Sequence, residues 1–151
     1  MPTSRRKRTI AASPQAVFEL VADPHHMPRW WPGVQRMEGV EEDRFTQVFT
    51  TKKGRAVRAD HFLLESEPPG PGGEPAGRIR WAQEVEGTPF ERVLSESVTE
   101  VVVAGADRGS EVVIAQTQTL RGYNRTGGFL LRRATRRKLD EALEGLERVL
   151  G

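Results

Sequence analysis

The chain has 151 residues with 29 % charged residues and a formal net charge of +2, which suits one globular domain and is too short for two ordinary ones. No apolar run approaches the about 18 residues that a membrane-spanning helix needs, and the absence of cysteine excludes disulfides, thiolate catalysis and zinc–thiolate sites. The basic N-terminus is followed by no apolar segment of the secretory kind. We therefore expect a cytoplasmic protein that forms a single domain over residues 1–151.

A short strand and two short helices are expected first. Residues 5–11 end in an apolar step and predict the strand. Ser13 followed by Pro14 is typical of a helix start, because serine caps free N–H groups and proline has none to leave unpaired. Asp23 next to a proline ends this helix and caps a second one over residues 25–31.

Six further strands follow, and most are joined by short turns. They are expected at residues 34–42, 44–52, 55–66, 78–86, 91–104 and 110–121. The segment 67–77 contains four prolines and four glycines, which predicts a loop. Consecutive strands with short connections form an antiparallel sheet, and a sheet of seven strands twists and curls.

A long helix from about Gly128 to Leu150 ends the chain. Its apolar stripe at helical spacing consists of Leu131, Thr135, Leu139, Ala142, Leu143, Leu146 and Val149. We place the basic cluster of this helix on the opposite, solvated face. Gly145 inside the helix marks either a close approach or a tolerated defect. Only this helix is long enough to fill the concave face of the sheet, so the element order predicts an α+β fold.

The stretch from Ser13 to Pro32 reads S-P-x-x-V-F-x-x-V-x-D-x-x-x-M-x-x-W-x-P, and the chain ends in GGFLLRRATRRKLDEALEGLERVL. These two segments resemble the opening helix pair and the closing helix of the SRPBCC, or START-like, superfamily, and more narrowly of its polyketide cyclase/dehydrase and lipid-transport group. The matching positions are Pro14, Val17, Phe18, Val21, Asp23, Met27, Trp30 and Pro32.

The resemblance implies a helix-grip fold. In this fold a seven-stranded curved antiparallel sheet surrounds the long C-terminal helix, with two short helices after the first strand. It also implies an internal cavity for a small hydrophobic ligand, such as a lipid, a polyketide or another aromatic or isoprenoid-like molecule. No catalytic motif carries over from the superfamily, and a fold alone is a weak argument for a particular activity.

Polar residues interrupt the inward faces of the predicted strands. Alternate residues of a strand share one face, and the more apolar face of each strand is expected to point inward. On these faces lie Gln47, His61, Gln83, Gln116 and Gln118. A buried amide or imidazole without a partner costs about 1–3 kcal/mol, so these groups pair with each other, with water or with a ligand. A wet cavity with aromatic walls would accommodate all five. The alternative is that bulges turn them to solvent.

Strand 91–104 has a less clear parity. We expect Val93, Ser95, Ser97, Thr99 and Val101 to face inward. The reason is that the other parity carries Glu96 and Glu100.

The expected ligand-binding residues combine the aromatic and polar inward positions. They are Trp30, Phe49, His61, Trp81, Gln83, Ser97, Gln116, Gln118 and Tyr123. Trp30 holds the position of the packing aromatic of the group, and a structural lid is the alternative to ligand contact. Trp81 offers a flat apolar wall with one N–H donor, although core packing explains it equally well.

A hydrophobic ligand-binding protein is the first functional hypothesis. The alternative is an enzyme of the polyketide cyclase, aromatase or dehydratase type, in which His61 acts as base and Tyr123 or Arg121 orients the substrate. We expect no cofactor and no metal, since the neighbouring His25 and His26 point about 100° apart on a helix, which suits one ion badly.

The basic segment 121–138 raises a third hypothesis. Its seven basic residues and lack of acids would suit an adaptor for an anionic membrane or a nucleic acid. A solvated helix face is the simpler interpretation, and no aromatic residues interleave these arginines. The expected partner is a small hydrophobic ligand, with no nucleic acid and no stable membrane insertion, in a monomer or homodimer.

Overall fold

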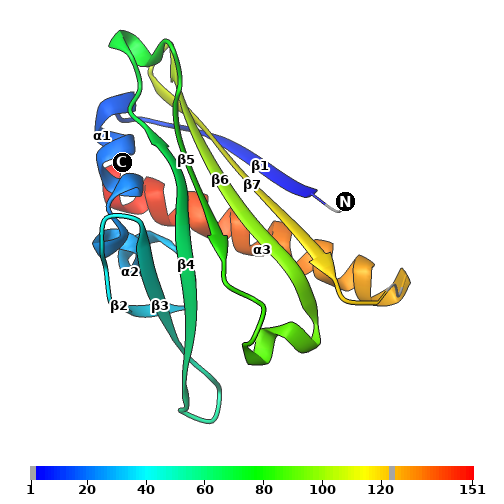
Figure 1. Ribbon diagram of the computed structural model, residues 1–151. Coiled ribbons are helices and arrows are strands. Elements are labelled where there is room, and N and C mark those ends of the chain that lie inside the picture. The colour runs from blue at the N-terminus through cyan, green and yellow to red at the C-terminus, as the bar shows by residue number, and fades with distance from the viewer. Residues whose placement is uncertain (1–2, 123–124) are drawn as a thin grey trace.

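In the computed structural model, which describes residues 3–122 and 125–151, seven strands form one sheet that curves around a long helix (Figure 1). The elements are β1 (Thr3–Ile10), α1 (Pro14–Ala22), η1 (Pro24–His26), α2 (Met27–Trp30), β2 (Val34–Glu38), β3 (Arg44–Thr50), β4 (Ala56–Glu67), η2 (Pro71–Gly73), β5 (Gly77–Gln83), η3 (Pro89–Arg92), β6 (Leu94–Ala106), β7 (Gly109–Leu120) and α3 (Arg125–Leu150). The elements written η are short 3-10 helices.

The sheet has the strand order β1-β7-β6-β5-β4-β3-β2, and all neighbouring strands are antiparallel. Sequential strands are neighbours except at β1, which pairs with β7 after the chain has crossed through α1 and α2. The long helix α3 runs across the sheet and contacts β1, β7 and α2 (Figure 1). The predicted α+β helix-grip fold is confirmed.

The helix starts form as the sequence predicts. The Ser13 hydroxyl accepts a hydrogen bond from Ala16 N at 3.1 Å, and Pro14 is the first residue of α1. The Asp23 carboxylate accepts from His25 N at 3.0 Å and caps η1. These bonds satisfy N–H groups that have no partner inside a first helical turn. They fix the place where the short helices meet the end of the sheet.

The apolar stripe of α3 is buried against the sheet and the short helices. Leu139, Ala142, Leu143 and Leu146 have no solvent exposure and join the main core. A Cβ atom at Gly145 would lie 2.4 Å from the Trp30 carbonyl oxygen. Gly145 therefore marks a close approach, and the partner is the backbone of α2.

The Pro- and Gly-rich loop is shorter than predicted, because β4 extends to Glu67 and β5 begins at Gly77. The loop packs against α1 and β6. The Gln15 side chain donates a hydrogen bond to Gly70 O at 3.1 Å, and a Cβ at Gly73 would lie 2.3 Å from Gly105 N. The loop thus closes the α1 end of the fold.

Several other boundaries differ from the prediction: for example, β5 ends at Gln83 instead of residue 86, and α3 begins at Arg125 instead of residue 128. Strand β2 stops at Glu38 instead of residue 42, and β6 begins at Leu94 instead of residue 91. Before β6, Pro89 starts the short helix η3, since proline has no N–H for a sheet ladder but fits a first helical turn. The helix η3 then forms one wall of the space between the sheet and α3.

Candidate functional site

A cavity of about 210 Å³ lies between the sheet and the middle of α3. Its walls come from five strands, from η3 and α3, and from the residue that follows α2. It is lined by Trp31, Gln47, Phe49, Ala59, His61, Trp81, Gln83, Phe90, Leu94, Ser97, Thr99, Gln116, Gln118 and Lys138. Aromatic rings and polar side chains therefore line the same partly open cavity.

The register of the sheet brings the polar residues of different strands to one level. Gln116 of β7 lies opposite Thr99 of β6, and Gln118 lies opposite Ser97. In the next two strands of the sheet, His61 of β4 lies opposite Gln83 of β5. Because alternate residues of a strand share a face, all these side chains point toward α3.

Most of the ligand-binding residues predicted from the sequence meet at this cavity. Those that line it are Phe49, His61, Trp81, Gln83, Ser97, Gln116 and Gln118. Tyr123 lies outside the described residues. Trp30 is absent from the described lining, and its neighbour Trp31 is there instead.

The two tryptophans separate because α2 ends between them. Trp30 is the last residue of α2 and is 2 % exposed, with its backbone against Gly145. Trp31 has an extended backbone that turns its ring toward the sheet, 5.7 Å from the Trp81 ring in an edge-to-face contact. Trp30 therefore packs in the core, and Trp31 supplies a wall of the cavity.

The predicted parity of β6 is wrong at its start and right after it. Val93 is 57 % exposed, Ser95 is also exposed, and Leu94 is buried in the cavity wall. A bulge between Leu94 and Glu96 shifts the register by one residue, which reverses the faces on either side of it. From Ser97 onward the inward residues are those expected.

His61 is held as a neutral imidazole. Its Nδ1–H donates to Ala59 O at 2.9 Å, and its ring stacks on Phe45 with centroids 5.2 Å apart. Burial lowers the pKa of His61 to about 4, although the Ala59 hydrogen bond and the Asp60 charge act in the opposite direction. At neutral pH Nε2 is therefore a free acceptor, with no hydrogen-bond partner in the described part of the chain.

The amides are only partly satisfied by the protein. Gln116 Nε2 donates to Thr99 Oγ1 at 2.8 Å, and Gln118 Oε1 accepts from Thr135 Oγ1 of α3 at 2.9 Å. Gln116 Oε1 and Gln83 Nε2 are buried, with no partner among the described residues. Each unpaired atom costs about 1–3 kcal/mol unless a water or a ligand completes it. The cavity is thus equipped to receive a molecule with polar atoms.

Lys138 is the lining residue that sequence reasoning misplaced. We expected it on the solvated face of the last helix, yet it is half-buried and its Nζ lies 5.8 Å from the centroid of the Trp31 ring. Burial lowers the pKa of Lys138 to about 8. The helical spacing of the sequence could have predicted this position. Residue 138 follows Thr135 by three residues and precedes Ala142 by four, so it lies on the apolar stripe.

Other candidate groups lie away from the cavity. Arg121 is exposed, and its Nε donates to Glu91 O at 2.7 Å, which ties the end of β7 to η3. His25 and His26 both contact the Asp23 carboxylate, at 2.9 and 3.7 Å. Across residues 3–122 and 125–151, no three His, Asp or Glu side chains come together in a metal-binding arrangement.

The basic residues near the chain ends are mostly solvated. Arg6 pairs with Asp140 at 3.5 Å and Arg8 with Glu144 at 3.9 Å, so β1 and α3 face each other with opposite charges. Such exposed pairs contribute little to stability. None of the helices in the described ranges is long and apolar enough to pass through a membrane.

Comparison with known proteins agrees with this architecture. The model of the family described as "Polyketide cyclase / dehydrase and lipid transport" matches residues 1–151. No curated protein matches the chain at a significant level.

Among solved structures, the chain is similar to the di-domain ARO/CYC BexL from the BE-7585A biosynthetic pathway, with a TM-score of 0.75 and 20 % identity over 98 % of this chain and 46 % of that one. A START superfamily protein from Mycobacterium smegmatis has a TM-score of 0.74 and 10 % identity, covering 98 % of this chain and 96 % of that one. A protein from Thermus thermophilus has a TM-score of 0.69 and 22 % identity, covering 97 % of this chain and 95 % of that one. At these identities the likeness is one of fold.

Proposed function

Because the chain belongs to the polyketide cyclase/dehydrase and lipid transport family, we propose that it binds a small, mainly apolar molecule in the cavity between the sheet and α3. The observation that carries this proposal is the combination of aromatic walls with unpaired buried polar atoms. Trp31, Trp81 and Phe49 supply flat apolar surface, while Gln83 Nε2 and Gln116 Oε1 lack partners among the described residues. Specific ligand sites have this composition, with apolar walls and a few fixed polar groups.

The size of the cavity limits the ligand. A protein cavity of about 150 Å³ holds benzene, and pockets for drug-sized molecules begin at about 300 Å³. The volume of about 210 Å³ therefore suits a molecule of one or two rings. Within the range of lipids, polyketides and aromatic molecules that the family suggests, small aromatic molecules fit best.

A pair of phenylalanine substitutions on β6 tests the binding site. Ser97 is 4 % exposed and lines the cavity, whereas Ser95 on the same strand is turned outward by the bulge. Ser97→Phe would fill the cavity, and Ser95→Phe adds the same group on the outside. We expect 2-naphthamide to quench the tryptophan fluorescence of the wild type and of Ser95→Phe, with affinity at least about tenfold weaker for Ser97→Phe.

Melting curves of both variants would show that each is folded. Equal affinity in Ser97→Phe and the wild type would mean that the ligand binds elsewhere. Native mass spectrometry of the purified protein would add the chemical class of any molecule that copurifies.

A second candidate is proton transfer on a ketone, as in a cyclase-type or dehydratase-type enzyme. The observation that favours it is the neutral His61, whose free Nε2 could remove a proton from carbon next to a carbonyl group. A pKa of about 4 makes this imidazole a weak base at pH 7, so binding remains the first candidate.

Exchange with heavy water tests proton transfer directly. We expect such an enzyme to exchange the α-protons of 2-tetralone for deuterium, detected by NMR, and His61→Phe to abolish the exchange. An exchange rate equal to that in buffer would exclude proton transfer on this ketone, and ligand binding would remain the proposed function.

A further inference from the structure

We propose that the polar end of the ligand is an anionic oxygen group, and that Lys138 binds it at the mouth of the cavity. The inferred ligand is therefore a small aromatic acid with one or two rings. This inference rests on the proposed function and deepens it by naming the class of ligand. It starts from the position of one side chain on α3.

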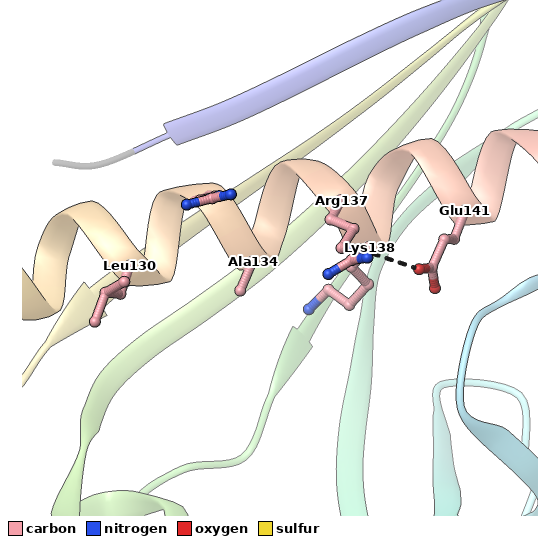
Figure 2. A pocket seen from close by; sticks show the side chains of 6 residues that line it. Leu130, Ala134, Arg137, Lys138 and Glu141 are labelled. Carbon is pink, nitrogen blue, oxygen red and sulfur yellow. Dashed lines mark ion pairs between the residues drawn. The ribbon is translucent and has the colours of Figure 1, made fainter.

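Lys138 is shared by two hollows. It lines the cavity between the sheet and α3, and it also lines an open groove of about 770 Å³ on the outside of the same helix. No other residue among the described linings of these two hollows is common to both. Figure 2 shows Leu130, Ala134 and Lys138 following one another along one side of α3. A ligand that entered the cavity from this groove would come into contact with the Lys138 side chain.

The charge of Lys138 is not neutralised by the protein. None of the described carboxylates lies within ion-pair distance of its Nζ, whereas the neighbouring Arg137 pairs with Glu141 at 3.9 Å (Figure 2). The only ring contact of the ammonium group in the described part of the chain is with Trp31, at 5.8 Å. With a pKa of about 8, Lys138 is mostly protonated at pH 7 and can pair with an anion.

The other groups of the cavity fit the same ligand. Gln83 Nε2 is a second unpaired donor, and it is buried in the wall. Two donors, one of them charged, suit the two oxygens of a carboxylate. Trp31 and Trp81, whose rings touch edge to face, would form two adjoining apolar walls against the ligand ring. With its lowered pKa, His61 is neutral at pH 7, so it does not add a second positive charge beside Lys138.

Two probes of equal shape and different charge test the inference. 2-Naphthoate carries a carboxylate, and 2-naphthamide replaces it with a neutral amide. We expect the wild type to bind 2-naphthoate about tenfold more tightly than 2-naphthamide at pH 7, measured by calorimetry at low ionic strength. In Lys138→Met this preference should disappear, while binding of 2-naphthamide persists.

Arg136→Met is the matched control. Arg136 lies on the same helix and is exposed, outside both the cavity and the groove, so the variant removes one positive charge without touching the site. Its preference for 2-naphthoate should equal that of the wild type. A preference lost equally in Arg136→Met and Lys138→Met would reveal general attraction by the basic helix and overturn the inference.

The outcomes separate the two proposals. If the wild type binds both naphthalene probes equally, the proposed cavity function stands and the role of Lys138 is overturned. If neither probe binds, the proposed function itself fails, together with this inference. Tight binding of 2-naphthoate that depends on Lys138 alone would support both.

Discussion

The space between the sheet and α3 has two ends, which the same strands and the same helix build in opposite ways. From Leu139 toward the C-terminus of α3, Leu139 and Leu143 belong with Val112 and Ile114 of β7 to a core without solvent exposure. On the N-terminal side of Leu139, Lys138 lines the cavity together with Gln116 and Gln118 of β7, and Thr135 donates a hydrogen bond to Gln118.

The change from apolar core to polar cavity occurs at the same level on the neighbouring strands β6 and β7. In β6 and β7 the pair Val101 and Ile114 belongs to the core, and the next inward pair, Thr99 and Gln116, belongs to the cavity. One step along the sheet thus replaces branched apolar side chains by polar ones. The alternation along a strand decides which face a residue occupies, whereas the residue type at each inward position decides whether that place becomes core or site. The cavity end gives up packing that the core end retains.

The largest effect is expected at the core end. Leu143 has no exposure, so Leu143→Ala should lower the free energy of unfolding by about 3–4 kcal/mol through lost burial and a new void. Thr135→Ala at the cavity end loses mainly the hydrogen bond to Gln118 and should lower it by about 1 kcal/mol. Denaturant unfolding of both variants measures the contrast, and equal losses would contradict it.

A pH effect of slightly smaller size is expected at the cavity end. The pKa of His61 is about 4 in the folded protein against 6.5 for an unperturbed histidine. Between these values the unfolded chain takes up a proton that the folded chain refuses, so stability falls as the pH drops from 6.5 to 4. The loss attributable to His61 reaches about 3 kcal/mol.

Variants at two histidines isolate this effect. His61→Phe keeps a ring against Phe45 and removes the titration, so its stability should fall less with acid than that of the wild type. His25 is exposed and pairs with Asp23, so His25→Gln removes that pair but should keep the loss of stability that we attribute to His61. Parallel urea titrations at pH 7, 5 and 4 measure the difference. An identical loss of stability with acid in His61→Phe and the wild type would show that His61 takes up its proton equally well in the folded and the unfolded chain.

The smallest expected effect is a gain in stability. At pH 7 the folded protein holds the Lys138 ammonium in a half-buried place without a carboxylate, so Lys138→Met should raise the stability of the ligand-free protein by about 1 kcal/mol. The wild type should recover this difference between about pH 8 and 10.5, because the folded chain releases the Lys138 proton there while the unfolded chain keeps it. Arg136→Met, which is exposed, should show no gain. A loss of stability in Lys138→Met would mean that its charge is already paired.

Much of the fold could be predicted because it follows from local patterns. The caps at Ser13 and Asp23, the alternation in the strands and the stripe of α3 depend on residues close in sequence. The same alternation was enough to place His61, Gln83 and Gln116 on the inward face. The resemblance at Ser13–Pro32 added the helix-grip arrangement, which the strand order confirms.

The sequence alone determined the element order, the inward faces of most strands and the polar residues that interrupt them, because periodicity is set by backbone geometry within one element. Only the tertiary structure decided that Trp31 instead of Trp30 faces the cavity, that a bulge after Leu94 reverses the start of β6, and that Lys138 turns inward. Each of these depends on how one element is rotated or shifted against another. The relative placement of two elements is fixed by packing between residues far apart in the sequence, such as Gly145 against Trp30. Such packing produces no periodic pattern from which it could be predicted.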